Sequence, residues 1–220
     1  LYIIVFTLIY RFFVAPSSRR AFLLGIAVGL QLYFYVHFWI YANILIGLLF
    51  GYTYIFRRGE PLKPWLLLMG IIAVFAVPYA TNFLLLSQLS DAYEQSSRIG
   101  FEYGWGFRLS VWREYLAYAA LGLAALWVIP PEAWRKRTFI IATLLAMVVG
   151  LNMQFFIGWN PQPDHWLKIY GVPLLAVSAL VVAALGGRLG RFFDAARFRS
   201  GFLIVALVLL LLGVNLLDVF

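Results

Sequence analysis

The longest apolar stretch of the chain runs from Ala21 to Phe56 and contains no Asp, Glu, Lys or Arg. As one α-helix it would be about 54 Å long, because a helix rises about 1.5 Å per residue. The hydrocarbon core of a bilayer is only about 30 Å thick, so this stretch is too long for a single crossing. We therefore predict two membrane helices that are joined near residues 35–40.

Six further apolar segments occur, and most of them have about the 20 residues that cross a bilayer. The chain is 64% hydrophobic and 12% charged, whereas a soluble domain is about 25% charged and therefore has enough charge to cover its surface. The sequence predicts an all-α polytopic transmembrane bundle with about eight membrane segments. The six further segments are Leu1–Ala15, Trp65–Leu86, Val111–Ile129, Thr138–Ile157, Ile169–Gly186 and Phe202–Phe220.

With this layout, basic residues gather in alternate loops, as the positive-inside rule expects of cytoplasmic loops. Twelve lie in the predicted cytoplasmic loops 16–20, 57–64, 130–137 and 187–201: Arg19, Arg20, Arg57, Arg58, Lys63, Arg135, Lys136, Arg137, Arg188, Arg191, Arg197 and Arg199. Three lie in the predicted outer loops 35–40, 87–110 and 158–168: Arg98, Arg108 and Lys168. A single crossing by the segment from Ala21 to Phe56 would abolish this asymmetry.

The net charge of +8 is explained by these cationic loops facing anionic lipid, so the charge does not indicate a nucleic-acid partner. The absence of cysteine excludes disulfides and thiolate chemistry. We expect one transmembrane domain over residues 1–220, in the plasma (inner) membrane of a prokaryote. We also expect a piece of a longer protein, because LYIIVFTLIY begins in mid-helix and LVLLLLGVNLLDVF ends as a helix would leave the membrane.

The outer loop GWNPQPDHW holds one of the two histidines of the chain. Its two prolines oppose helix formation and predict an extended loop. Asp164 would then stand at the N-cap of the next helix, with Trp166 as an anchor at the lipid headgroups. The functional alternative makes Asp164 and His165 a proton-transfer or metal-binding couple at the membrane surface.

Two amides, Asn152 and Gln154, fall in the last two turns of the preceding predicted helix. Polar side chains are costly at this depth of a membrane. Hydrogen bonds between helices would explain them. Alternatively, they form the polar floor of a substrate cleft.

The predicted turn YVHFWIY contains Tyr35, His37 and Trp39. An aromatic belt at the membrane surface accounts for the Tyr and Trp residues, but it does not account for the histidine. Aromatic faces also stack on the apolar C–H surfaces of sugar rings and prenyl chains. Both interpretations stay open at this point.

The connection from Ser87 to Arg108 is the longest loop, and loops of this length are usually functional or disordered. Its aromatic content, including Trp105, argues against disorder. Arg98 and Arg108 lie on the side that disfavours basic residues, so we expect a phosphate or carboxylate partner for them. Pairing with acidic residues of the same loop, such as Glu102, is the alternative.

Two motifs of glycines spaced by three residues, GIAVG at 25–29 and GLLFG at 47–51, predict close helix packing. Without cysteine, and with two histidines, a zinc site of the His/Cys type is excluded. A carboxylate–histidine site for a divalent cation stays possible, although no ligand spacing indicates one. We predict no further cofactor.

From about Arg19 to Gly186 the chain resembles the multi-pass GT-C glycosyltransferases. The resemblance is carried by the hairpin AFLLGIAVGLQLYFYVHFWIYANILIGLLFGY, the aromatic-rich outer loop with Arg98, and the late outer loop that ends in PDHW. It implies a GT-C-like helical fold and transfer of a sugar from a polyprenyl-phosphate donor at the extracytoplasmic membrane face. It also implies an acidic catalytic motif in a first outer loop, which would lie before Leu1.

This resemblance makes a lipid-linked sugar donor and membrane lipids the expected partners, with the oligomeric state left open. It assigns supporting roles to Asp164, His165 and Glu102, with Asp164 and His165 near the acceptor. A membrane transporter or lipid-linked-saccharide flippase, and a non-catalytic membrane subunit, are the alternatives. The expected donor-binding or acceptor-binding residues are Tyr35, His37, Trp39, Arg98, Trp105, Arg108, Asn152, Gln154 and Trp166.

Overall fold

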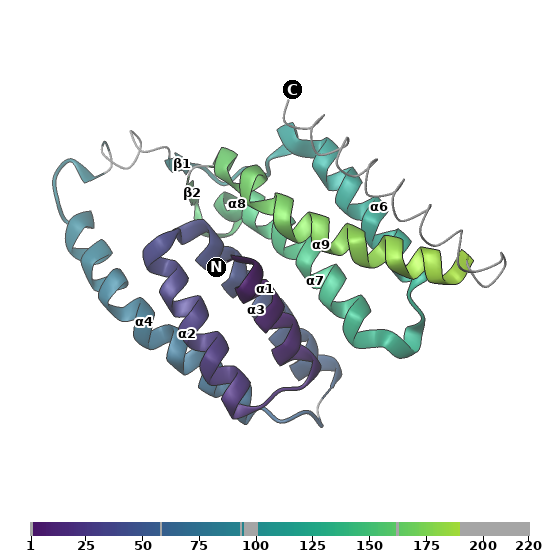
Figure 1. Cartoon of the computed structure of the whole chain (residues 1–220). Coiled ribbons are helices and arrows are strands. Elements are labelled where there is room, and N and C mark those ends of the chain that lie inside the picture. Colours follow the sequence, from purple (N-terminus) through teal and green to yellow (C-terminus); the bar gives the residue numbers. More distant parts are fainter. Residues whose placement is uncertain (1, 58, 93, 95–100, 162, 190–220) are drawn as a thin grey trace. The chain divides into compact units, whose positions relative to one another are not determined.

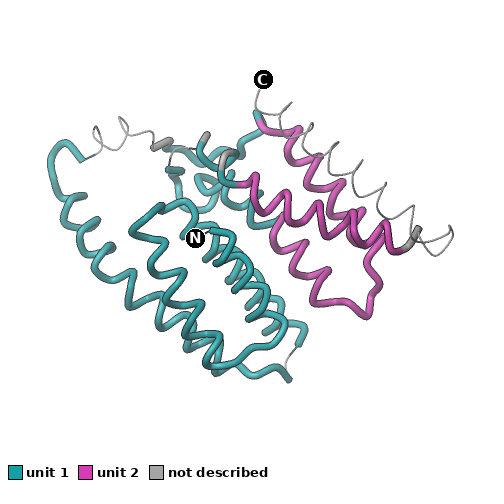
Figure 2. The backbone as a smooth tube through the Cα atoms, viewed as in Figure 1, with its two compact units in different colours: residues 1–110, 145–169 teal, residues 111–144, 170–220 magenta. Residues whose placement is uncertain are grey.

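The computed structural model describes residues 2–57, 59–92, 94, 101–161 and 163–189 (Figure 1). The predicted segment from Phe202 to Phe220, Arg98 and most of the predicted loop 187–201 lie outside the described residues. The chain forms two compact units (Figure 2). Unit 1 consists of residues 1–110 and 145–169, and unit 2 consists of residues 111–144 and 170–220.

Unit 1 confirms the prediction that the long apolar stretch forms two helices. Helix α2 (Ser18–Phe34) ends one residue before helix α3 (Val36–Phe56) begins. The intervening Tyr35 has an extended backbone, with φ −161° and ψ 106°. The break lies at the start of the predicted interval 35–40, and it sets a side chain with a hydroxyl group between two apolar helices.

The turn between α1 (Tyr2–Val14) and α2 is stabilised by groups that satisfy helix ends. Ser17 caps α2, because its hydroxyl accepts a hydrogen bond of 3.3 Å from the backbone N–H of Arg20. The Arg20 guanidinium donates to two carbonyls at the end of α1, those of Arg11 at 3.1 Å and Ala15 at 2.7 Å. This turn lies at the same end of unit 1 as the turn that joins α3 to α4 (Figure 1).

Helix α4 (Lys63–Ser87) packs along α2, and the GIAVG motif supplies the contact. A Cβ atom added to Gly25 would lie 2.8 Å from Cγ2 of Ile71, and one added to Gly29 would lie 2.4 Å from Cγ of Phe75. The packing role predicted for this motif is therefore confirmed. The same prediction fails for GLLFG within the described residues, because added Cβ atoms at Gly47 and Gly51 meet nothing within 4 Å.

The opposite end of unit 1 contains a short two-stranded sheet that the sequence pattern did not predict (Figure 1). Strand β1 (Phe101–Tyr103) comes from the long connection, and strand β2 (Trp159–Pro161) comes from the GWNPQPDHW loop. The strands are antiparallel, with Glu102 opposite Asn160. A short helix, α8 (Met153–Ile157), precedes β2. Pairing of these two loops brings together segments that are more than 50 residues apart in the chain.

Unit 2 contains α6 (Trp112–Val128) and the first part of α7 (Trp134–Leu151), joined by a 3₁₀ turn at Pro131–Ala133. The two helices meet at Gly122, where an added Cβ would lie 3.3 Å from Cδ1 of Ile141. Arg137 donates its guanidinium to carbonyls at the end of α6, with Nε 2.6 Å from Ile129 O and Nη2 bonded to Leu126 O. This arginine satisfies the end of the preceding helix, as Arg20 does in unit 1.

The remaining elements are a 3₁₀ turn at Leu109–Val111 and helix α9 (Pro163–Leu189), which contributes to both units. Within the described residues, three helical stretches are long and apolar enough to cross a membrane: Val36–Phe56, Lys63–Ser87 and His165–Gly187. The predominantly helical, membrane-type fold is therefore confirmed. The count of about eight membrane segments stays a prediction.

The packing of α2 on α4 leads to a paired test at two helical glycines. Gly29→Ala should destabilise the protein by about 1–3 kcal/mol relative to Gly51→Ala, because its methyl group overlaps the Phe75 ring. The gain in helix propensity, about 1 kcal/mol, is common to both variants and cancels in the comparison. Thermal unfolding of the purified protein in mild detergent measures the difference. Equal melting temperatures would contradict the packing described for Gly29.

Candidate functional site

Both histidines lie in one cluster of unit 1, where the α2–α3 turn meets β2 and the start of α9. Tyr35 Oη lies 2.9 Å from Nδ1 of His165, and His37 Nε2 lies 2.9 Å from the carbonyl oxygen of Pro161. The ring centroids of His37 and His165 are 5.5 Å apart, and those of His37 and Tyr35 are 5.0 Å apart. The sequence predicted these three residues as site candidates from separate loops, and the fold brings them together.

The partner of His37 determines which of its ring nitrogens carries the proton. The carbonyl of Pro161 can only accept a hydrogen bond, so Nε2 of His37 is the donor and carries hydrogen. In the neutral ring Nδ1 is then a lone-pair acceptor. His37 is 2% exposed, and among the residues that the structure describes its buried Nδ1 has no hydrogen-bond partner. A buried acceptor of this kind is suited to a hydroxyl or another donor group of a ligand.

The Tyr35–His165 pair has a different property, because both of its members can donate or accept. Burial raises the pKa of Tyr35 above its ordinary value of 10.0, so the phenol is protonated at neutral pH. If Tyr35 donates to Nδ1, then Nε2 of His165 carries hydrogen; if Nδ1–H donates to the phenol oxygen, Nε2 has a free lone pair. His165 is only partly buried, so this pair offers a nitrogen that can give or take a proton near the surface of unit 1.

A third polar side chain, Gln31, lies one helical turn before Tyr35 in α2. It is 1% exposed, and within the described part of the chain neither its amide nitrogen nor its amide oxygen has a hydrogen-bond partner. Unsatisfied buried amides are costly, and they require an explanation in a native structure. Gln31 and His37 together place three unpaired polar atoms in the helices that flank Tyr35.

Asn160 of β2 holds the GWNPQPDHW loop in place through both the oxygen and the nitrogen of its side-chain amide. Its Oδ1 accepts a bond of 2.7 Å from the indole N–H of Trp166. Its Nδ2 lies 2.7 Å from Oε1 of Gln154 and 3.2 Å and 3.3 Å from the carbonyls of Leu151 and Gly150. Asn160 and Trp166 are both completely buried. Because the indole can only donate, the orientation of the Asn160 amide is determined by its partners.

The two amides predicted at the membrane floor fix the end of the long connection instead of linking two helices. Asn152 Oδ1 accepts from the backbone N–H of Arg108 at 2.8 Å. Gln154 Nε2 donates to the carbonyl of Gly106 at 3.1 Å. The predicted continuous helix is wrong at Asn152, because α7 ends at Leu151 and α8 begins at Met153. Asn152 is freed from the helix and is therefore able to bond the loop.

Gly158, which follows α8, also contacts the long connection. Its φ of 79° lies in the left-handed region, which favours glycine, and an added Cβ would lie 2.8 Å from the Trp105 ring. The carbonyl of Gly158 accepts from the backbone N–H of Gly104 at 2.9 Å. Trp105 itself is 70% exposed, so one face of its ring is available at this end of unit 1.

The structure places several of the predicted residues differently from what the sequence indicated. Helix α9 begins at Pro163, so Asp164 lies in the first turn of the helix and not before it as predicted. Trp166 is not an exposed headgroup anchor, because it is completely buried against Asn160 and His37. Trp39 lines a groove between α3 and α4. The predicted residue Arg98 lies outside the described residues.

Sequence reasoning missed Asn160 and the carbonyl of Pro161, which are the two groups that orient the cluster. An asparagine beside prolines is typical of loops, and nothing in its spacing indicates burial. Within the described residues, no group of three or more His, Asp or Glu side chains could hold a metal ion. The divalent-cation site of the sequence analysis therefore has no candidate ligand set in this part of the chain.

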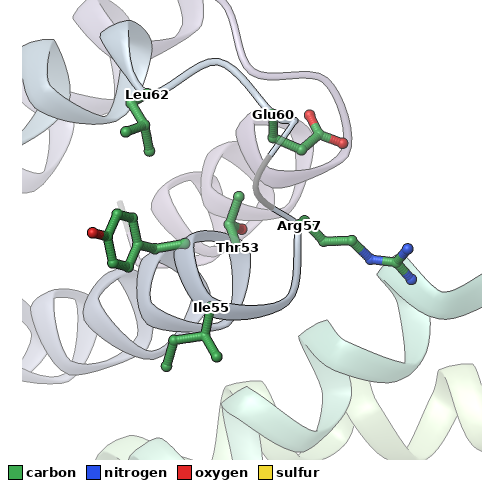
Figure 3. A pocket seen from close by; sticks show the side chains of 6 residues that line it. Thr53, Ile55, Arg57, Glu60 and Leu62 are labelled. Carbon is green, nitrogen blue, oxygen red and sulfur yellow. The ribbon is translucent and has the colours of Figure 1, made fainter.

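A pocket of about 430 Å³ lies at the other end of unit 1 and is lined by Thr53, Arg57 and Leu62 among others. Figure 3 shows that the Arg57 side chain points away from Thr53 and Leu62. The guanidinium of Arg57 is therefore not directed at an anion bound in this pocket. Neither this pocket nor the one lined by Trp39 lies at the histidine cluster.

Comparison with protein-family models, with curated proteins and with solved structures finds no match for this chain.

The Asn160 network predicts a large effect for an isosteric change. Asn160→Asp keeps the acceptor for Trp166 and replaces the donor by an oxygen that faces three other oxygens. We expect a loss of stability of about 3 kcal/mol or more, because buried donors are removed and a charge is buried without a partner. Thermal unfolding of the purified protein measures this loss. A melting temperature equal to that of the unmodified protein would contradict the network.

Proposed function

We propose that this chain belongs to a membrane glycosyltransferase of the GT-C type, which moves a sugar from a polyprenyl-phosphate carrier to an acceptor at the extracytoplasmic face of a prokaryotic plasma membrane. The observation that carries the proposal is the convergence of Tyr35, His37 and His165 at one end of unit 1. The other end of unit 1 carries basic residues in both of its turns.

The orientation of the site follows from that charge distribution. Arg19 and Arg20 flank the α1–α2 turn, and Arg57 and Lys63 flank the α3–α4 turn at the same end (Figure 1). Turns rich in Arg and Lys are retained in the cytoplasm. The α2–α3 turn and the sheet of β1 and β2 then face outward, where lipid carriers present their sugars.

The chemistry of sugar transfer suits a group that takes a proton at this surface. The acceptor hydroxyl forms a bond to the anomeric carbon, and the bond from that carbon to the phosphate oxygen of the carrier breaks. The hydroxyl proton must leave as the new bond forms, and we assign its removal to Nε2 of the partly exposed His165 instead of to the acidic motif that the resemblance implies before Leu1. The polyprenyl phosphate leaves with the electron pair of the broken bond.

Binding of the donor would use the long connection. Its last residues are held by Asn152 and Gln154, so the backbone of Arg108 has a fixed position beside the exposed Trp105 ring. A guanidinium suits a phosphate diester, and an exposed indole face suits a sugar ring or a prenyl chain.

A non-catalytic membrane subunit is the second candidate, and a specific observation favours it. Asn160, Trp166 and Asn152 are buried and bonded to one another or to backbone groups, as a purely structural junction requires. The two proposals differ in what they expect of His165. Its removal should have little effect on a non-catalytic subunit, whereas it should remove the general base of an enzyme.

The orientation can be tested with introduced cysteines, because the chain has none of its own. In intact cells a membrane-impermeant maleimide should label Trp105→Cys. The same reagent should label Glu60→Cys, in the α3–α4 turn, only after the membrane is opened. Both are surface positions of unit 1, so a difference reports the side of the membrane. The reverse labelling pattern would remove the extracytoplasmic site.

Sugar transfer in membranes containing the protein tests the activity, with a radiolabelled polyprenyl-phosphate sugar as donor. His165→Ala should lower the rate about 10²- to 10⁴-fold, as expected for loss of a general base. Tyr35→Phe removes one hydrogen bond and should lower the rate about tenfold or less. Tyr33→Phe is the matched control, because that hydroxyl bonds only the carbonyl of Phe75 at 2.8 Å. Equal rates in all three variants would support the structural subunit instead.

A further inference from the structure

A groove of about 260 Å³ lies between α3 and α4 of unit 1, away from the histidine cluster. Both helices are long and apolar enough to span a membrane, so the groove lies within the stretch of these helices that would cross the hydrocarbon of the bilayer. Gly47 and Ala73 are among its exposed lining residues, and an added Cβ at Gly47 meets nothing within 4 Å. The GLLFG motif, which has no packing partner in this part of the chain, thus contributes a hollow and not a helix contact.

The groove is apolar along most of its length and polar at one end. Ile46, Met69 and Ile72 belong to the apolar part. Trp39 and Asn43 form the polar part, in the first two turns of α3. Asn43 donates one amide hydrogen to the carbonyl of Trp39 at 2.7 Å, which leaves it a second amide hydrogen and an oxygen for another partner. The indole nitrogen of Trp39 is buried and has no acceptor among the described residues.

The level of these polar groups indicates the chemistry of the occupant. From Trp39 to Gly47 the groove descends about 12 Å along α3, which is less than half of a hydrocarbon core of about 30 Å. Trp39 and Asn43 are the lining residues nearest the N-terminal end of α3, so they are the ones on the side of the headgroup boundary, where the ester carbonyls of glycerolipids are found. Both residues carry N–H donors, and an ester carbonyl is an acceptor. A polyprenyl chain is hydrocarbon below its phosphate and offers no acceptor at this level.

We propose that the α3–α4 groove is a binding site for one acyl chain of an ester-linked glycerolipid, with the ester carbonyl at Trp39 and Asn43 and the chain over Gly47. This site is independent of the proposed transferase activity. It would fill the space that α3 and α4 leave between them.

Photolabelling of the reconstituted protein tests the proposal. The probe is a phosphatidylglycerol with a photoactivatable diazirine in one acyl chain, in vesicles of unlabelled phosphatidylglycerol. Labelling should map to the lining residues of α3 and α4. Gly47→Leu fills the groove and should reduce labelling of these helices about tenfold, whereas Gly51→Leu, one turn further and equally open, should not. Equal labelling of both variants would overturn the site.

The role of the ester is tested by competition. Unlabelled diester lipid should displace the probe about three- to tenfold better than the matching diether lipid, the ratio expected for one hydrogen bond. Trp39→Phe combined with Asn43→Leu should abolish this preference while the folded protein keeps its helical circular dichroism. Equal competition by the two lipids in the unmodified protein would overturn the ester contact. Displacement of the probe by polyprenyl phosphate at lower concentration than the diester would assign the groove to that lipid instead.

Discussion

Irregular backbone at the end of a membrane bundle must find hydrogen-bond partners inside the protein, and in unit 1 the amide of Asn160 is the central provider. It joins the broken end of α7, the short helix α8 and the start of α9 through four hydrogen bonds. Non-helical segments at membrane depth are tolerated only where protein groups satisfy them. The strands β1 and β2, the pinned loop at Arg108 and the positions of both histidines depend on that arrangement.

The same requirement explains the hydrogen bonds that two arginines make at other helix ends. Arg20 and Arg137 come from turns that the charge pattern assigns to the cytoplasm, and each donates to the last carbonyls of the preceding helix. Their charge is of the sign that the positive-inside rule retains in the cytoplasm, and their guanidinium hydrogens satisfy backbone groups that the helix leaves open. One residue type thus meets a topological and a structural requirement at once.

Much of the helical layout could be predicted from the sequence, because membrane thickness limits helix length. The length of the stretch from Ala21 to Phe56 required a break, and Tyr35 supplies it. The site was less predictable. Tyr35, His37 and His165 stood out by chemical type, but the contacts that orient them come from Asn160 and a proline carbonyl, which no periodicity indicates. Glycine spacing was also ambiguous, since the same motif forms a helix contact at Gly29 and an open groove at Gly47.

The joint between α2 and α3 is a single residue, and this has a mechanical consequence. The backbone of Tyr35 joins two long helices directly. A change in the angle between these helices would therefore displace the Tyr35 phenol relative to His165. Helix tilt follows bilayer thickness, because spans adjust to match the hydrocarbon layer. The length of the hydrogen bond between the phenol and the imidazole would accordingly depend on the lipid composition around the protein.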